Sequence, residues 1–240
     1  MNRQILSLMT AAMVLMAAFA SCSKDNNSKK DDPGGGGGGG ALEVNATVVD
    51  GNEYNGYIAT AKAMMGDYDA IASAKYANGG FKLNLPESVS AKYLYSIDDA
   101  FDFEEDFEGT ISDRKAKISE TWLFAYDRED DEIGGFWWTN ENEDVWAFYV
   151  YVDRNLTIKG HESWYDSYEN EYYYYEYDCS FTKGWNILYE VEKGRYEYLL
   201  TTKKPSGTTL KWYYEDWDWW KKSPSDRQHP FSKMRQCAQK

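Results

Sequence analysis

Histidine and cysteine are scarce in this chain of 240 residues, which contains two histidines and three cysteines. The sequence has no Cys-x-x-Cys pair, and its histidines, His161 and His229, are far apart. Protein zinc sites are built from three or four such side chains at short, recurrent spacings. We therefore expect no metal site and no cofactor.

Basic residues are also in deficit, with 26 lysines and arginines against 40 aspartates and glutamates and a formal charge of −14. Non-specific nucleic-acid binding needs a basic surface that displaces counterions from phosphates. The same excess of carboxylates disfavours electrostatic attachment to anionic lipid. The composition thus argues against nucleic-acid partners.

Long apolar runs are limited to one, Ile5 to Ala20, interrupted by Ser7 and Thr10 and preceded by Arg3. A transmembrane helix needs about 20 consecutive apolar residues, so this run is short for a span but has the length of an export signal. We interpret residues 1–21 as a signal peptide that is removed. Its loss takes away Arg3 and no acidic residue, which makes the charge of the mature chain −15.

The signal ends in Phe19-Ala20-Ser21-Cys22. This sequence resembles the lipobox of bacterial lipoproteins, although that family more often has leucine where Phe19 stands. The resemblance implies that Cys22 becomes the lipidated amino terminus, that its sulfur carries a diacylglycerol, and that palmitate is among the attached acyl chains. Several acyl chains give a lasting anchor, so we expect a protein attached to the outer membrane of the cell envelope without spanning it.

Residues 23–40 are polar and end in seven glycines, Gly34 to Gly40. Such a segment has too little apolar surface to offset the entropy of ordering it, and as a flexible chain its typical reach is about 23 Å. We interpret 22–40 as the lipidated cysteine and its tether. The stretch "CSKDNN" resembles the surface-export signal of Bacteroidetes lipoproteins, with Asn26 where the pattern has a second acid, so cell surface and periplasmic leaflet both stay open.

The remaining chain is rich in rings, and the whole sequence holds 10 Phe, 10 Trp and 21 Tyr. Aromatic residues favour strands, and short strands recur at hairpin spacing with Asp, Asn, Gly and Ser turns. We predict an all-β fold, an antiparallel sandwich or barrel-like meander. The alternation in 81–85 and the stretch "VVDGNEYNGYIATAKA" resemble small transthyretin-like sandwiches, which implies a smaller β unit at 41–97.

The acidic stretch 98–106 interrupts the pattern and is interpreted as a connection to a second β unit, 98–220, although one β domain or two both stay open. The stretches "DVWAFYVYVDRNLTIKG" and "CSFTKGWNILYEV" resemble uncharacterised all-β lipoproteins of the Bacteroidetes. Residues 221–240 form a basic tail that docks on the acidic body or frays. A disulfide between Cys179 and Cys237 stays an open alternative to two free thiols.

Two strands have informative alternation. In 171–181, Tyr173, Tyr175, Tyr177, Cys179 and Phe181 share one face, whereas the other face carries the more polar set with Tyr172 and Tyr174. One face of this strand should be core and the other solvated. Residues 145–152 are apolar on both faces, which predicts a central or covered strand.

Catalytic motifs are missing. His161 lies in "GHES", which lacks the Gly-x-Ser-x-Gly elbow of hydrolases, and the acidic loops 127–132 and 140–144 lack the ligand spacing of a calcium loop. Carboxylate pairs for glycoside hydrolysis are too abundant to discriminate. We expect a protein without enzymatic activity, with a glycoside hydrolase as a distant third alternative.

Aromatic stacking is the better functional hypothesis, because flat rings flanked by carboxylates suit sugar rings and hydroxyls. Rings stand at strand ends or on acidic faces in Trp137-Trp138, Trp164-Tyr165 and 215–220. We expect glycan binding, with these candidate residues: Trp164, Tyr172, Tyr174, Trp217, Trp219 and Trp220. The alternative is a structural or assembly role against an envelope protein or polymer, which burial of the tryptophans at 217–220 would favour. The sequence fixes neither the ligand nor the oligomeric state.

Overall fold

The structure is a computed structural model and describes residues 41–66, 69–101, 103, 107–166 and 170–217. The signal peptide 1–21, Cys22, the tether, the tail 221–240 with Cys237, and Trp219 and Trp220 therefore lie outside the described residues. The predicted all-β class is confirmed, since strands make up 61% and helices 8% of the structure. The arrangement is that of an all-β sandwich.

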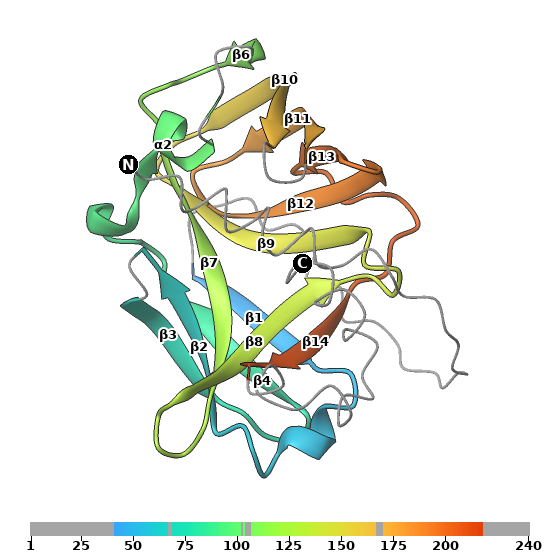
Figure 1. Cartoon of the computed structure of the whole chain (residues 1–240). Helices are drawn as coiled ribbons and strands as arrows, with labels where there is room; N and C mark the ends of the chain where they lie inside the picture. Colours follow the sequence, from blue (N-terminus) through green and yellow to red (C-terminus); the bar gives the residue numbers. More distant parts are fainter. Residues whose placement is uncertain (1–40, 67–68, 102, 104–106, 167–169, 218–240) are drawn as a thin grey trace.

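The strands are organised in a 12-stranded sheet and a two-stranded sheet (Figure 1). The small sheet pairs β1 with β4, and the large sheet follows the order β3-β2-β7-β8-β9-β12-β13-β11-β10-β6, with β14 on β8 and β5 on β7. The strand bounds are β1 Leu42–Thr47, β2 Thr60–Met65, β3 Asp69–Lys75, β4 Gly80–Leu85, β5 Tyr95–Ser96, β6 Glu108–Ile111, β7 Lys117–Tyr126, β8 Glu132–Thr139, β9 Val145–Val152, β10 Leu156–Asp166, β11 Glu171–Phe181, β12 Gly184–Gly194, β13 Glu197–Thr201 and β14 Lys211–Asp216.

Helical structure is confined to short connections. These are the 3₁₀ turns η1 (Gly51–Tyr54) and η2 (Ala91–Tyr93) and the single-turn helix α2 (Ile97–Phe101). The acidic stretch expected to be a plain connection thus contains part of α2, whose Ile97 and Phe101 are buried. No helix among the described residues is long and apolar enough to cross a membrane.

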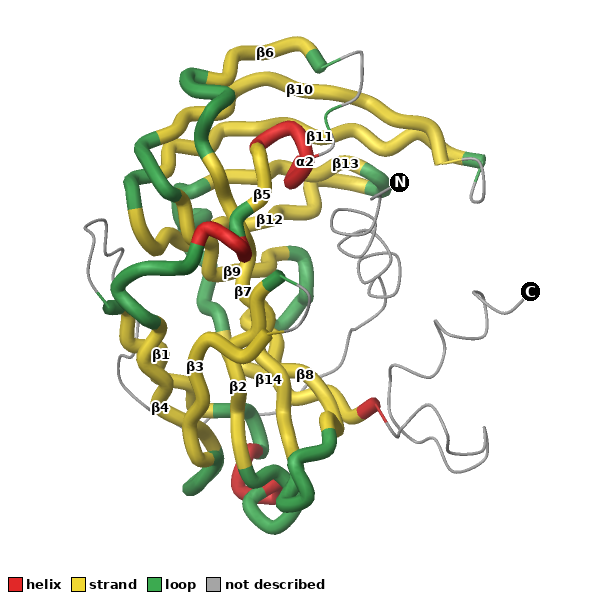
Figure 2. The backbone as a smooth tube through the Cα atoms, turned by 90° about the vertical axis from the view of Figure 1, so that its left-hand side faces the viewer, coloured by secondary structure: helices red, strands yellow, loops and turns green. Residues whose placement is uncertain are grey.

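The two faces of the large sheet support separate cores. One face, which we call face A, packs against the small sheet β1–β4. Tyr149 and Trp212 of the large sheet share this core with Leu83 of β4. The opposite face, face B, forms a second core with α2 that includes Tyr177 and Leu188. Figure 2 shows β6, β10, β11, β13 and β12 at one end of the molecule and β1, β2, β3, β4, β8 and β14 at the other, with β7 and β9 between them.

The ranges 41–97 and 98–220 share a sheet and a core. β2 pairs antiparallel with β7 from Thr60↔Tyr126 to Met64↔Trp122, across more than 50 positions of sequence. The face A core combines Val44 and Phe81 of the first range with Ala147 of the second. The transthyretin-like resemblance concerned only local strand patterns and could not show this long-range pairing.

The predicted alternation of β11 is confirmed. Tyr173, Tyr175 and Tyr177 are buried, as are Cys179 and Phe181, whereas Tyr172 and Tyr174 are exposed. Cys179 is a free thiol whose Sγ donates to the carbonyl oxygen of Leu200 at 3.3 Å. Strand β9 is central as predicted, because it pairs with β12 and with β7.

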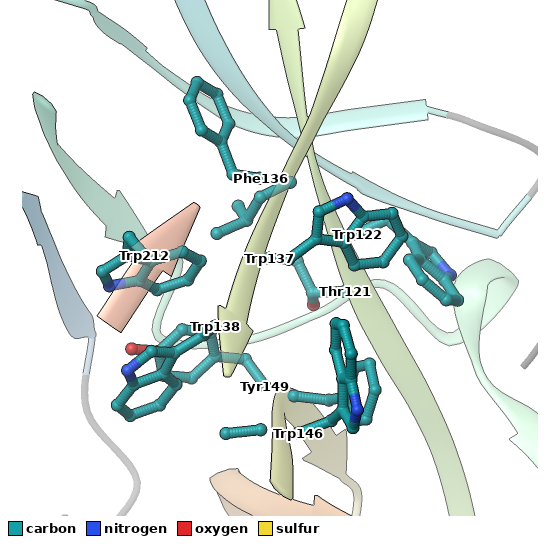
Figure 3. A pocket seen from close by; sticks show the side chains of 11 residues that line it. Thr121, Trp122, Phe136, Trp137, Trp138, Trp146, Tyr149 and Trp212 are labelled. Atoms are coloured by element: carbon teal, nitrogen blue, oxygen red, sulfur yellow. The ribbon is translucent and has the colours of Figure 1, made fainter. Parts of the chain in front are cut away.

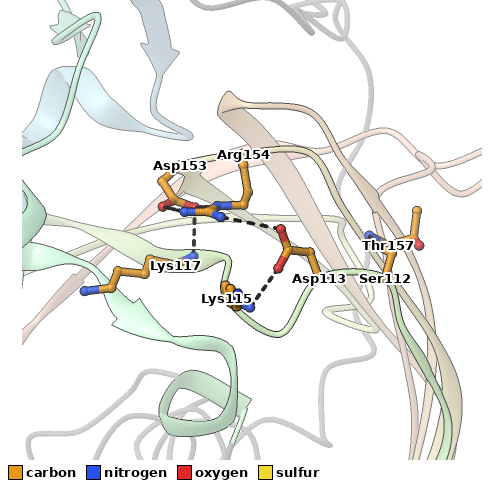
Figure 4. A network of polar contacts seen from close by, with 7 residues as sticks. All are labelled: Ser112, Asp113, Lys115, Lys117, Asp153, Arg154 and Thr157. Atoms are coloured by element: carbon orange, nitrogen blue, oxygen red, sulfur yellow. Dashed lines mark hydrogen bonds and ion pairs between the residues drawn. The ribbon is translucent and has the colours of Figure 1, made fainter.

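A polar network fixes the turn before β7 against the turn after β9 (Figure 4). Arg154 contacts Asp113 at 3.5 Å and Asp153 at 3.1 Å, and Asp153 accepts a hydrogen bond from the backbone N–H of Lys117 at 2.9 Å. These ion pairs are half exposed, and such pairs contribute little energy individually. Together they link the two turns.

Candidate ligand-binding surfaces

The exposed rings of the protein are concentrated on one hairpin. Only four large hydrophobic side chains are exposed among the described residues, and three of them, Tyr165, Tyr172 and Tyr174, lie on β10 and β11; the fourth is Tyr57. Antiparallel pairing places Tyr165 directly opposite Tyr172, and Ser163 opposite Tyr174. We call this group the tyrosine surface.

The local sequence explains the arrangement. Alternate residues of a strand project to opposite faces, so Tyr172 and Tyr174 of β11 share the outer face with Tyr165 and His161 of β10. The ring centroids of Tyr165 and Tyr172 are 5.1 Å apart at 52°, and His161 stacks on Tyr174 at 5.6 Å. This outer face belongs to face A, beyond the part that the small sheet covers.

The three tyrosine rings expose enough of their surface to contact a ligand. Tyr172 is 68% exposed, Tyr165 47% and Tyr174 41%. The hydroxyl of Tyr165 donates to Oδ1 of Asn170 at 2.6 Å, which holds that ring in place. Exposed apolar clusters rimmed by polar groups mark interaction sites, whereas isolated exposed rings do not.

Carboxylates surround the tyrosine surface. Glu176 is exposed opposite His161, and Glu197 of β13 pairs with Tyr174 on the same face. Farther along β11, Asp178 is engaged by Lys159 at 3.3 Å and by Lys203 at 2.7 Å, and the pKa of Asp178 is lowered mainly by the hydrogen bond from Lys203. The lysines are therefore occupied, and the acceptors nearest the rings are acidic.

The other predicted aromatic candidates lie elsewhere. Trp164 projects to the inner face of β10, where it stacks on Tyr173 at 4.7 Å and 11°. Trp217 is half-buried; its ring packs edge-on to Phe124 and its Nε1 donates to Glu132 at 3.0 Å. Phe124 and Glu132 thus cover part of Trp217, whereas Trp219 and Trp220 of the same predicted group lie outside the described residues.

A pocket opens where β7 leaves β9 and joins β8 (Figure 3). β7 pairs with β9 from Ile118 to Thr121 and with β8 from Phe124 onward, while β8 meets β9 only at Thr139↔Trp146. The pocket fills this gap. Its lining is mainly aromatic: Thr121, Trp122, Leu123, Phe136, Trp137, Trp138, Trp146, Ala147, Phe148, Tyr149 and Trp212.

The pocket has two sides. On face A, Trp138 stacks on Trp212 at 5.5 Å and on Tyr149 at 5.6 Å, which makes that side part of the core. On face B, Trp137 meets Trp122 at 5.9 Å and Trp146 at 6.2 Å, with both ring pairs near perpendicular. The rings on face B are half-buried. We call this side the tryptophan pocket.

The acidic loops considered for calcium form hydrogen-bonded turns. Asp127 Oδ1 accepts from the backbone N–H of Glu129 and of Asp131, and Asn140 Oδ1 accepts from Asp144 and Val145. The described residues contain no group of three or more His, Cys, Asp and Glu side chains arranged to hold a metal ion.

Comparison of the chain with models of protein families, with curated proteins and with solved structures finds no match. The class that the structure defines is an all-β sandwich protein with an exposed cluster of tyrosines. Function is therefore argued from the surfaces alone.

Two features escaped sequence reasoning. The tryptophan pocket depends on the divergence of β7 from β9, which no local pattern encodes. His161 was considered as a metal ligand and as a catalytic residue, yet it stacks on Tyr174. The alternation His161, Ser163, Tyr165 along β10 was the available signal for that contact.

Proposed function

We propose that this protein is a lipid-anchored protein of the outer membrane or cell surface that binds glycan without catalysis. The observation that carries the binding proposal is the clustering of three of the four exposed large hydrophobic side chains, Tyr165, Tyr172 and Tyr174, on one hairpin. The anchoring proposal rests on Cys22 and its lipobox-like context.

The chemistry of the tyrosine surface suits saccharides. Tyrosine faces present a flat apolar area for the C–H face of a sugar ring, and their hydroxyls exchange hydrogen bonds with sugar hydroxyls. Successive exposed rings on β11 are two residues apart, a spacing of about 6.7 Å along a strand. Glu176 and Glu197 beside them supply further acceptors.

The test is binding of the full chain to a panel of neutral polysaccharides, followed by calorimetry. We expect a Tyr172→Ala/Tyr174→Ala variant to bind about tenfold or more weakly, because two aromatic contacts of about 0.5–1.5 kcal/mol each are lost. Tyr57→Ala is the matched control, since Tyr57 is 39% exposed but lies away from the hairpin. Equal binding by the double variant and the control would refute the proposal.

Lipid attachment is tested separately. We expect radiolabelled palmitate to be incorporated by the wild-type chain in a bacterial host and not by Cys22→Ser. Incorporation of palmitate by both chains would show that the lipid is not attached at Cys22 and would contradict the anchoring proposal.

The alternative is an accessory role against an envelope protein or polymer. The half-buried position of Trp217, directly after β14, supports it, because that ring packs on Phe124. Two results together would favour this role: cross-linking in cells captures one envelope protein through the tyrosine surface, and no polysaccharide of the panel binds.

A further inference from the structure

The last described residue, Trp217, lies on face B. β14 ends at Asp216, and the ring of Trp217 lies beside Gly135 of β8, where a Cβ would be 3.4 Å from that ring. The Nε1 atom of Trp217 donates to Glu132 at 3.0 Å, and the ring packs edge-on to Phe124 of β7 at 6.3 Å. Trp217 therefore extends from the end of β14 across β8 to β7, toward the middle of the large sheet.

The rings of the tryptophan pocket continue from this point (Figure 3). The same Cβ position at Gly135 is 3.5 Å from the ring of Trp137, and that ring contacts both Trp122 and Trp146. All three indoles are half-buried, and among the described residues the face B core around α2 does not include them. Clustered apolar surface bordered by polar groups is typical of an interaction site. A segment that lies across these rings needs no space inside the pocket.

Carboxyl groups border these rings. Asp144 lies in the turn between β8 and β9, and its carbonyl oxygen accepts the backbone N–H of Glu192 at 2.8 Å. Burial, followed by the charge of Asp144, raises the pKa of Glu192, and burial, followed by the charge of Glu215, raises the pKa of Glu143 to about 7. Within the described part of the chain, no lysine or arginine forms an ion pair with Glu132, Glu143 or Glu192. The negative charge at this border is therefore uncompensated there.

The sequence after Trp217 has the complementary composition. Residues 218–240 carry six basic side chains and only two acidic ones, together with four large apolar ones. An extended chain of this length reaches roughly 70 Å, whereas β8 and β12 are only about 10 Å apart across the sheet. Its length therefore does not limit where it reaches on face B. The basic residues are Lys221, Lys222, Arg227, Lys233, Arg235 and Lys240, and the apolar ones are Trp219, Trp220, Phe231 and Met234.

We propose that residues 218–240, which we call the strap, fold back across face B and cover the rings of the tryptophan pocket. The apolar side chains of the strap remove these rings from water, and its basic side chains compensate the carboxylates of Glu132, Asp144 and Glu215. Trp217 fixes the point where the strap begins. A second copy of the chain fits this face less well, because its net charge of −14 repels an acidic surface. The strap is separate from the tyrosine surface and does not depend on glycan binding.

Limited digestion of the full chain with trypsin tests this proposal without any substitution. Mass spectrometry compares cleavage after Lys222 and Arg227 in the strap with cleavage after Lys29 in the predicted tether, which serves as the internal reference. We expect cleavage in the strap to be at least about tenfold slower, because a docked segment must detach before it is cut. In 1 M NaCl, where charges are screened within about 3 Å, this ratio should fall by about threefold or more. Equal cleavage rates at low salt, or protection that salt does not change, would overturn the proposal.

Two variants locate the docked strap. Trp137→Ala removes the ring at the centre of the pocket, and we expect it to speed cleavage in the strap about tenfold relative to the tether. Tyr172→Ala on the tyrosine surface is the matched control and should leave the ratio unchanged.

If Trp137→Ala does not fold, as judged by circular dichroism, Glu132→Gln/Glu192→Gln replaces it. This variant preserves the shape of the face, and we expect about threefold faster cleavage in the strap. Unchanged protection in a folded variant would show that the strap docks elsewhere and would refute the proposal. Protection that rises with protein concentration would identify a second copy as the occupant of face B and would refute it as well.

Discussion

Replacing the buried carboxyl group of Glu190 should stabilise the protein at neutral pH. Glu190 is 2% exposed, and burial, followed by the charges of Glu120 and Glu192, raises its pKa from 4.5 to about 8. The folded protein therefore keeps this group protonated at pH 7, whereas the unfolded chain ionises it. That difference favours the unfolded state.

The magnitude follows from linkage. In the unfolded chain the Glu190 carboxyl group has a pKa of 4.5, about 2.5 units below pH 7. Each pH unit corresponds to 1.36 kcal/mol, so keeping this group protonated lowers the free energy of unfolding at pH 7 by about 3 kcal/mol. Because the pKa of this carboxyl group is higher in the folded protein, the protein has its full stability below pH 4.5 and loses about this amount as the pH rises toward 8. Glu190→Gln, which resembles the protonated acid, should gain about 3 kcal/mol at pH 7 and nearly nothing at pH 4.5.

Urea denaturation followed by circular dichroism at pH 4.5, 6, 7 and 8 measures this difference. The wild-type midpoint should fall over this range more steeply than that of Glu190→Gln, at equal slopes in denaturant. Glu176→Gln is the control, since Glu176 is exposed on β11 and should behave as wild type. A Glu190→Gln variant that is less stable than wild type at pH 7, with parallel pH profiles, would show that the carboxylate is ionised and paired and would refute the reasoning.

Two further predictions concern the core and the small sheet. Burial, and then the charge of a nearby glutamate, raises the pKa of Tyr175 and of Tyr177 well above the usual value of 10. Above pH 10 the unfolded chain ionises these tyrosines and the folded protein does not, so the free energy of unfolding should fall by about 1.4 kcal/mol for each tyrosine at pH 11. Absorbance at 295 nm and urea denaturation from pH 9 to 11 check this, and full ionisation of all tyrosines near pH 10 without unfolding would contradict it. In the small sheet, Gly80→Ala should destabilise by about 1–3 kcal/mol, because a Cβ there overlaps the carbonyl oxygen of Ala46 on β1. Thermal unfolding measures the loss, and Gly56→Ala, where a Cβ meets nothing within 4 Å, should be near neutral; equal melting temperatures of the two variants would contradict the predicted overlap.

Local patterns along the chain were sufficient to predict the strand content and which faces of two strands, β9 and β11, are buried. In β11 the strict alternation of rings and polar residues was sufficient to predict that Tyr173 is buried and that Tyr172 and Tyr174 are exposed. In β9 the absence of a polar face was sufficient to predict a central position. These features depend on the two-residue period of a strand, which is a local property.

Which strands pair with one another, and what each of their faces covers, followed from the folded arrangement and not from local patterns. Trp164 was a candidate for the exposed surface, but it lies on the inner face of β10 together with Glu162, which is buried. Because a glutamate in a strand normally marks the solvated face, its presence there concealed that Trp164 points inward. The pairing of β14 with β8 and of β2 with β7 joins distant segments, and the divergence of β7 from β9 creates the tryptophan pocket. Such pairings depend on the complementarity of whole faces and on loop closure, so no single strand encodes them.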